Sequence, residues 1–115
     1  MATKNNIKAK SSTIQTHVHE FELSTRLAEL GADRHNHRFA GVSGQVIPVG
    51  TTHVHLITTN TDFLDHFHRI VVVTGPAIRI TSTKHVHLAR GTTTFVDGHR
   101  HGFTFTTQIN SPLVL

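Results

Sequence analysis

Histidine is the residue whose number and spacing most clearly indicate chemistry in this sequence. The chain has 115 residues and 12 histidines, and every histidine belongs to a His-x-His pair. Random placement would produce roughly one such pair, so the pattern indicates a specific use. The six pairs are His17/His19, His35/His37, His53/His55, His66/His68, His85/His87 and His99/His101.

A His-x-His pair on a β-strand places both imidazoles on one face, because side chains alternate between the two faces. The two alpha carbons then lie about 6.6 Å apart, so the rings can converge on one ion. The same alternation continues from each pair into apolar residues: Phe21, Leu23, Phe39, Ile57, Ile70, Val72, Ala89, Phe103 and Phe105. The histidines are therefore predicted to face the core.

Imidazoles that face a core need partners. An unpartnered buried polar group costs roughly 1–3 kcal/mol, whereas an ordinary domain has only about 5–15 kcal/mol of net stability. The sequence has seven acidic residues and no cysteine, and Asp33, Asp65 and Asp97 precede the second pair of each repeat rather than facing it. A divalent transition metal fits, because it binds neutral imidazole and, as structural zinc, adds about 10–16 kcal/mol of folding free energy. All the histidines are therefore predicted metal ligands.

The pairs can be grouped around ions in two economical ways. If the two pairs of one repeat meet in a hairpin, four imidazoles form a tetrahedral site, which favours zinc. If the opening pairs of all repeats converge on one ion and the second pairs on another, each site is octahedral and favours iron, nickel or cobalt. Both groupings fill the coordination sphere with protein ligands, which is typical of a structural ion. Because protons compete with metal for imidazole, we also expect acid to destabilise the protein.

The sequence repeats with a period of about 33 residues, which is typical of repeat architectures. We divide it into units 16–51, 52–83 and 84–115, each opening with His-Val-His and reaching a second pair after a polar turn. Alternating apolar runs bounded by Gly, Asp, Asn and Pro predict two longer strands and one short strand per unit. The spacing of Leu23–Leu30, followed by Gly31, predicts a short helical turn.

These patterns predict an all-β domain over residues 16–115, with three internal repeats and pseudo-threefold symmetry. A β-prism, a small barrel and a trefoil-like arrangement all fit. The net charge of +4 comes mainly from Lys4, Lys8 and Lys10 in the polar leader 1–15. Three lysines without interleaved aromatic residues argue against nucleic-acid binding.

The sequence has no apolar run long enough for a membrane span and no signal-peptide core near its start, so synthesis in the cytoplasm is the default expectation. The location remains open, and assembly on a cell surface or a spore is compatible with the sequence. We expect self-association into an oligomer or filament, through the leader and the apolar tail 112–115, because free strand-like ends commonly add to a neighbour.

Two rival functions remain at this stage: metal storage or sensing, and a cupin-like metalloenzyme. His17-Val18-His19 with Glu20 and Glu22 partly resembles a metal-binding motif of the cupin barrels, but the spacing of the glutamates is short and four other pairs are unexplained. No constellation of residues indicates a nucleophile. We therefore expect a non-enzymatic protein without catalytic residues.

The joint between units two and three carries a family resemblance. The segments are Thr61-Asp62-Phe63, His66-Phe67-His68, Thr74-Gly75-Pro76-Ala77-Ile78 and His85-Val86-His87. In content and order they resemble the YmaF family of short, histidine-rich bacterial proteins, over residues 16–105. The resemblance implies a bacterial source and no particular activity. The chain departs from the family at 79–81, where a turn rich in proline and glycine would be expected.

Overall fold

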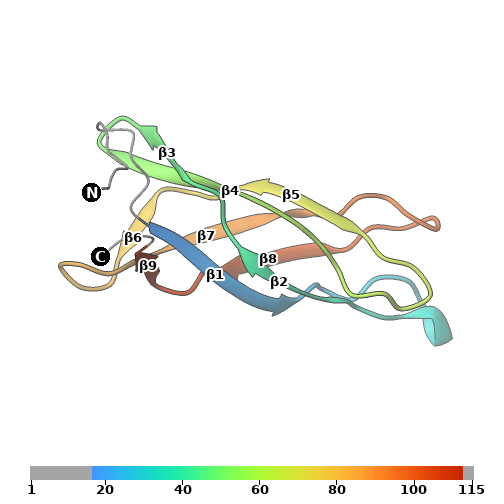
Figure 1. Ribbon diagram of the computed structural model, residues 1–115. Coiled ribbons are helices and arrows are strands. Elements are labelled where there is room, and N and C mark those ends of the chain that lie inside the picture. Colours follow the sequence, from blue (N-terminus) through green and yellow to red (C-terminus); the bar gives the residue numbers. More distant parts are fainter. Residues whose placement is uncertain (1–16, 113–115) are drawn as a thin grey trace, which may run out of the picture.

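The computed structural model describes residues 17–112, in which all regular structure except one short 3-10 helix, Gly31–Asp33, is β-strand (Figure 1). An all-β fold is therefore confirmed. The leader 1–15 and residues 113–115 lie outside the described part, and the domain boundaries stay predictions. The strands are β1 (His17–Ser24), β2 (Arg38–Val42), β3 (Val46–Val49), β4 (Thr52–Asn60), β5 (Arg69–Val73), β6 (Ala77–Arg79), β7 (His85–Thr92), β8 (Gly102–Thr106) and β9 (Asn110–Pro112).

The strands form three antiparallel sheets of three strands each, in the orders β2-β1-β9, β3-β4-β5 and β6-β7-β8. The central strand of each sheet carries the opening histidine pair of one repeat. The C-terminal half of each central strand pairs with the strand that follows it along the chain, namely β2, β5 or β8. The N-terminal half pairs with a short strand, namely β9, β3 or β6.

Each short strand is contributed by the preceding repeat. After β2 the chain moves to the second sheet, where β3 pairs with β4; after β5 it moves to the third, where β6 pairs with β7. After β8 the chain returns to the first sheet, where β9 pairs with β1. Backbone bonds also join neighbouring sheets in a cycle, because the N–H groups of Gly44, Gly75 and Gln108 donate to the carbonyls of Leu56, Leu88 and Glu20. The three sheets therefore form a closed ring.

The buried apolar residues lie on the inner faces of these sheets, as the strand alternation predicts. The core consists of Phe21, Phe39, Ile57, Ile70, Ala89, Phe103 and Phe105, with Leu23 and Val72 packed against it. All of these residues were expected from the sequence, so this prediction is confirmed.

Side-chain size is balanced across each hairpin. The three cross-strand pairs at one level of the core are Phe21 with Gly41, Ile57 with Val72, and Ala89 with Phe105. In the first and third hairpins a large side chain on one strand thus faces a small one on its partner, whereas Ile57 and Val72 in the second are of similar size. The fit is close in the first hairpin, because a Cβ atom added at Gly41 would lie 2.9 Å from Cζ of Phe21.

The predicted helical turn is wrong for Leu23–Leu30, and the helical turn described in this loop is the 3-10 helix Gly31–Asp33 that follows. Leu23 lies in β1, paired with Phe39, and Ala28 forms an isolated antiparallel bridge with His35, so the segment is largely extended. Leu27 and Leu30 are 52% and 88% exposed, so the leucine spacing does not mark a buried helical face. Within residues 17–112, no helix has the length and apolar character required to cross a membrane.

Candidate metal centres

The described histidines form two separate clusters of six. Within each cluster, the potential ligand nitrogens lie within 4.8 Å of one another. Cluster A contains the opening pairs: His17, His19, His53, His55, His85 and His87. Cluster B contains the second pairs: His35, His37, His66, His68, His99 and His101.

Hairpin register separates the two pairs of each repeat. In the first hairpin Leu23 pairs with Phe39 and Ser24 with Arg38. The pair at the start of β1 therefore lies at one end of the hairpin, and the pair that precedes β2 lies at the other end. The core residues occupy the strands between them. The grouping of four histidines per repeat is therefore wrong, and the grouping of six histidines across the repeats describes the structure.

Distances within the clusters match an octahedral site. Neighbouring Nε2 atoms are 3.1–3.2 Å apart in cluster A and 3.2–3.3 Å apart in cluster B. Dividing these edges by the square root of two places an ion about 2.2–2.3 Å from each nitrogen, with opposite nitrogens about 4.4–4.7 Å apart. That separation is within the observed limit of 4.8 Å.

The inner histidine of each pair is fixed by a bond at its other nitrogen. In cluster A, Nδ1 of His19, His55 and His87 donates to the backbone carbonyls of Gln108, Gly44 and Gly75, each at 2.9 Å. In cluster B, Nδ1 of His68 and His101 donates to the carbonyls of Thr94 and Arg26 at 2.8 and 2.9 Å, and Nδ1 of His37 bonds to Asp62.

These bonds determine which nitrogen carries the hydrogen. A carbonyl oxygen only accepts, so Nδ1 must be the protonated nitrogen and a neutral ring then has a bare lone pair on Nε2. His68 and His99 show the consequence. Both donate from Nδ1 to a backbone carbonyl, yet their Nε2 atoms are 3.3 Å apart. Two lone pairs at this distance repel unless a cation lies between them.

Within residues 17–112, one buried nitrogen in each cluster has no hydrogen-bond partner. These atoms are Nε2 of His55 and Nε2 of His101, and the side chains of both residues are fully buried. An unsatisfied buried acceptor is costly. A metal ion at the centre of each cluster would bind the orphaned nitrogen of that cluster, so the donor sets fit a metal.

Burial also keeps several of the rings neutral. Desolvation lowers the pKa of His19 to about 3 and the pKa of His17, His87 and His101 to about 4, and repulsion from other histidines of the same cluster acts in the same direction. Metal binding requires the neutral ring. At neutral pH these side chains are therefore in the form that binds a metal.

A set of buried hydroxyl groups supports the inner histidines and was missed from the sequence. Each hydroxyl accepts a hydrogen bond of 2.9–3.1 Å from the backbone N–H of one inner histidine. The residues are Thr25, Ser43, Thr61, Thr74, Thr93 and Thr107. Aligning the repeats would have found them, because a Ser or Thr recurs at each equivalent position.

The surroundings of the two clusters differ in charge. In cluster B, a carboxylate oxygen of Asp62 is 3.1 Å from Nδ1 of His37, one of Glu29 is 3.2 Å from Nδ1 of His99, and one of Asp97 is 3.7 Å from Nδ1 of His66. Asp97 thus faces a histidine from the second pair of another repeat, whereas we expected it only to precede the second pair of its own repeat.

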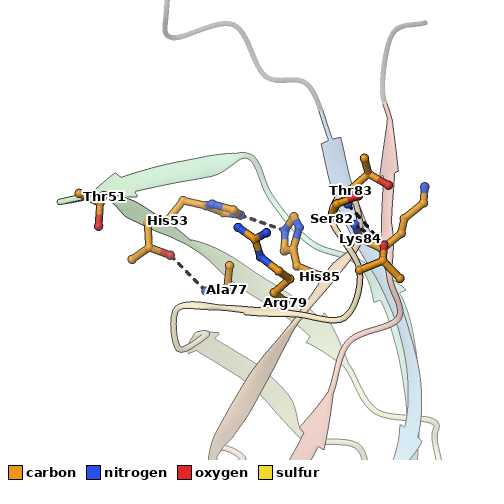
Figure 2. A pocket seen from close by; sticks show the side chains of 10 residues that line it. Thr51, His53, Ala77, Arg79, Ser82, Thr83, Lys84 and His85 are labelled. Carbon is orange, nitrogen blue, oxygen red and sulfur yellow. Dashed lines mark hydrogen bonds between the residues drawn. The ribbon is translucent and has the colours of Figure 1, made fainter.

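A basic pocket of about 360 Å³ lies beside cluster A. Figure 2 shows the side chain of Arg79 next to His53 and His85, whose Nε2 atoms are 3.1 Å apart. Lys84 also lines the pocket, and none of its described lining residues is acidic. Glu20 and Glu22, which would be needed for a cupin-like site, are exposed and outside both clusters.

Comparison with known proteins gives one positive result. No curated protein and no solved structure matches this chain. A family model described as "YmaF: Spore germination protein GerY/YamF" matches residues 14–109. This match includes both histidine clusters and most of the chain, so the protein belongs to the YmaF family.

Proposed function

We propose that this protein binds two divalent transition-metal ions, one at the centre of each cluster, and that the ions hold the three sheets together. The observation that carries the proposal is the convergence of six Nε2 atoms in each of two clusters, with the inner rings held by Nδ1 bonds to other parts of the chain. Each ion would join all three sheets, because each cluster takes two ligands from every repeat.

The burial of the ligands supports a structural role over storage. The inner histidines of both clusters are all fully buried: His19, His37, His55, His68, His87 and His101. An ion surrounded by these rings can leave only when several of its buried ligands move apart. A storage protein needs ions that exchange readily, so slow exchange from the folded protein is the expected behaviour.

The number of ligands supports a non-enzymatic role. Six protein nitrogens complete an octahedron and leave no position for a substrate or an activated water molecule. The same number bears on metal identity. Octahedral sites with imidazole ligands suit iron, nickel or cobalt, whereas zinc in structural sites is almost always tetrahedral. We therefore propose iron, nickel or cobalt as the bound metal.

Elemental analysis of the natively purified protein tests this proposal, with two ions per chain as the expected result. His55→Ala should remove the ion of cluster A, and His101→Ala the ion of cluster B, so each variant should retain one. Arg100→Ala is the matched control, because Arg100 is the exposed middle residue of a pair. Native protein without transition metal, or with a four-coordinate spectrum, would contradict the proposal.

Rapid exchange is the one result that would favour metal storage or sensing. Native protein can be incubated with an isotopically enriched form of its own metal at neutral pH. A structural protein should exchange the ion of cluster A no faster than it unfolds. Exchange of this ion much faster than unfolding would support the storage alternative.

We also propose that the protein is a self-associating subunit of a spore-associated structure. The description of its family as a spore germination protein supports the location. Support for association comes from the polar leader 1–15, which lies outside the described residues, and from the apolar tail 112–115, of which only Pro112 is described. Size-exclusion chromatography and negative-stain imaging of the chain without residues 1–15 test the role of the leader. The same oligomer with and without it would contradict that role.

A further inference from the structure

We propose that Asp65, His66 and Asp97 form an entry site, which binds a divalent cation on its way into cluster B. The proposal rests on the function proposed above. It concerns how the ion reaches a buried site, a question that the geometry of the cluster alone does not answer.

The three side chains lie at the outer end of cluster B. Their potential ligand atoms are within 4.8 Å of one another, and both aspartates are exposed. His66 is 11% exposed and belongs to both groups, because its Nε2 is 3.2 Å from the Nε2 atoms of His37 and His99. Nε2 of the ring therefore lies in the cluster and Nδ1 is directed to Asp97, with Asp65 in the same group of potential ligands.

The distance from His66 to Asp97 suits a shared cation better than a hydrogen bond. Nδ1 of His66 is 3.7 Å from the nearer carboxylate oxygen of Asp97. An N–H···O hydrogen bond requires about 2.7–3.2 Å. Two ligands at about 2.1 Å from one ion lie between about 3.0 Å apart at a right angle and about 4.2 Å apart when opposite. The observed distance falls in this second range.

His66 also differs from every other histidine of cluster B in its hydrogen bonds. The other five each donate from Nδ1: His35 and His99 to carbonyls of their own turns, and His37, His68 and His101 to Asp62, Thr94 and Arg26. Among the described residues, no hydrogen bond is formed by Nδ1 of His66.

The tautomer of His66 in the metal-free protein follows from this difference. Its hydrogen is best placed on Nε2, which can donate to the lone pair of His37 or His99. Nδ1 then has a bare lone pair that faces Asp65 and Asp97, so one nitrogen and two carboxylates are ready for a cation.

Once cluster B holds an ion, the entry site should no longer bind a cation. When the ion binds Nε2 of His66, the hydrogen of that nitrogen leaves to solvent and a proton from solvent binds Nδ1, so the ring stays neutral. A protonated Nδ1 no longer binds metal. The site therefore binds a cation in transit, and the loaded protein holds two ions rather than three.

Cluster A has no equivalent group among the described residues, since the basic Arg79 and Lys84 line the pocket beside it. A negative entrance raises the local concentration of cations and speeds their association. Exchange at cluster B is therefore expected to be the faster of the two.

The test uses protein loaded with Co²⁺, whose release to excess EDTA is followed by the loss of cobalt absorption. Wild-type protein should show a faster phase from cluster B and a slower one from cluster A. In the double variant Asp65→Asn/Asp97→Asn, the faster phase should slow by about tenfold, because an entry site is also the exit. General damage to the fold would instead speed release. Uptake of Co²⁺ by metal-free protein should slow to a similar extent.

Asp33→Asn is the matched control. It removes one carboxylate at the same end of the molecule, from a residue whose backbone carbonyl, not its side chain, bonds to His35. Wild-type release from the double variant, or equal slowing in Asp33→Asn, would overturn the proposal. So would a third Co²⁺ ion in loaded wild-type protein. Failure of the proposed function itself is distinguishable, because the chain would then bind no Co²⁺ at either cluster.

Discussion

An imidazole can bind a metal only through an unprotonated nitrogen that points at the ion, and each inner histidine here is held in that state by two contacts. Its Nδ1 donates to another part of the chain, and its backbone N–H donates to a buried hydroxyl. For His55 these partners are the carbonyl of Gly44 and Oγ1 of Thr74. Bonds of this kind fix the tautomer and the direction of a ligand ring.

Removing one of these hydroxyls should destabilise the protein. In Thr74→Val the backbone N–H of His55 loses its acceptor at 3.1 Å and stays buried. We expect the free energy of unfolding, measured in urea with metal bound, to fall by about 1–3 kcal/mol. Thr74→Ser is the control and should be close to wild type, because Ser43 does the same for His19. Equal stability of the Val and Ser variants would contradict this role.

The metal-free protein should lose stability as the pH falls from about 6.5 to about 4. Burial lowers the pKa of His19 to about 3 and of His17, His87 and His101 to about 4, from 6.5 in the unfolded chain. In this window the unfolded state binds more protons than the folded state, so protonation favours unfolding, by up to about 1.4 kcal/mol per pH unit for each histidine.

Melting curves at pH 7 and pH 5 check the sign of this effect. The melting temperature of both the metal-free and the metal-loaded protein should be lower at pH 5, because protons also compete with the ion for imidazole. An unchanged melting temperature would mean that the rings do not change their protonation on unfolding.

At the residue level, the sequence predicted which side chains face the core but not their partners. The spacing from His19 to Phe21 already shows that both lie on one face of a strand. The acceptors of the Nδ1 bonds are backbone carbonyls such as that of Gln108, 89 positions along the chain from His19. Every residue has a carbonyl, so no sequence pattern marks the one that is used.

At the level of the elements, the first and third hairpins each pair a large side chain with a small one. Phe21 faces Gly41 in the first hairpin, and Ala89 faces Phe105 in the third, so the same space is filled from opposite strands. The combined volume of each pair, rather than the residue at either position, determines the fit.

Moving the large side chain of the first hairpin from position 21 to position 41 should therefore destabilise the protein less than either single change. Phe21→Ala should leave a cavity and cost about 3–5 kcal/mol. Gly41→Phe should collide with Phe21, because even a Cβ atom there is 2.9 Å from its ring. The double variant Phe21→Ala/Gly41→Phe, which has the same arrangement as Ala89 and Phe105 in the third hairpin, should recover much of the lost stability. Urea denaturation of all three variants measures the coupling, and a double variant no more stable than the worse single one would contradict the volume argument.

At this level the predicted strands were confirmed and the predicted helical turn was wrong, and both outcomes have physical reasons. The strands were found because alternation repeats over many residues, as in β4. The helical turn was wrong because the spacing of Leu23, Leu27 and Leu30 matches a helix, whereas the real segment continues from a strand and exposes the last two leucines. The sequence could not distinguish the octahedral grouping from the tetrahedral one. The register of each hairpin determines whether the two histidine pairs of a repeat meet, and this register cannot be read from the sequence.

For the whole molecule, the return of β9 to the first sheet is the contact that closes the ring. In this short strand Asn110 pairs with His19, and the side-chain oxygen of Asn110 accepts from the backbone N–H of His85 at 2.9 Å. The pairing of β9 with β1 thus lies directly beside cluster A and far along the sheets from cluster B.

A chain that ends at Ile109 should therefore lose the ion of cluster A and keep that of cluster B. Elemental analysis should find one ion per chain instead of two. A chain that ends at Pro112 is the matched control, because it retains β9 and should hold two ions. If both ions remained without β9, closure would not be needed for cluster A; if both were lost, the clusters would form one cooperative unit.

The number of repeats was visible in the sequence, but the exchange of short strands between sheets was not. Strands of three or four residues, such as β6 and β9, contain too few alternations to specify a partner or a register. Their pairing depends on where the chain emerges from the preceding hairpin, which is a property of the folded ring.

The pairing of β9 with β1 also means that the fold does not require the chain to start at β1. Since β9 pairs with β1, His17 lies opposite Pro112 and the two ends of the described chain are adjacent. A linker across this junction, with a new start at Thr52 or Lys84, would retain every sheet and both clusters. Circularly permuted versions of the protein should therefore reach the same fold, because the order of the repeats matters and the point of entry does not.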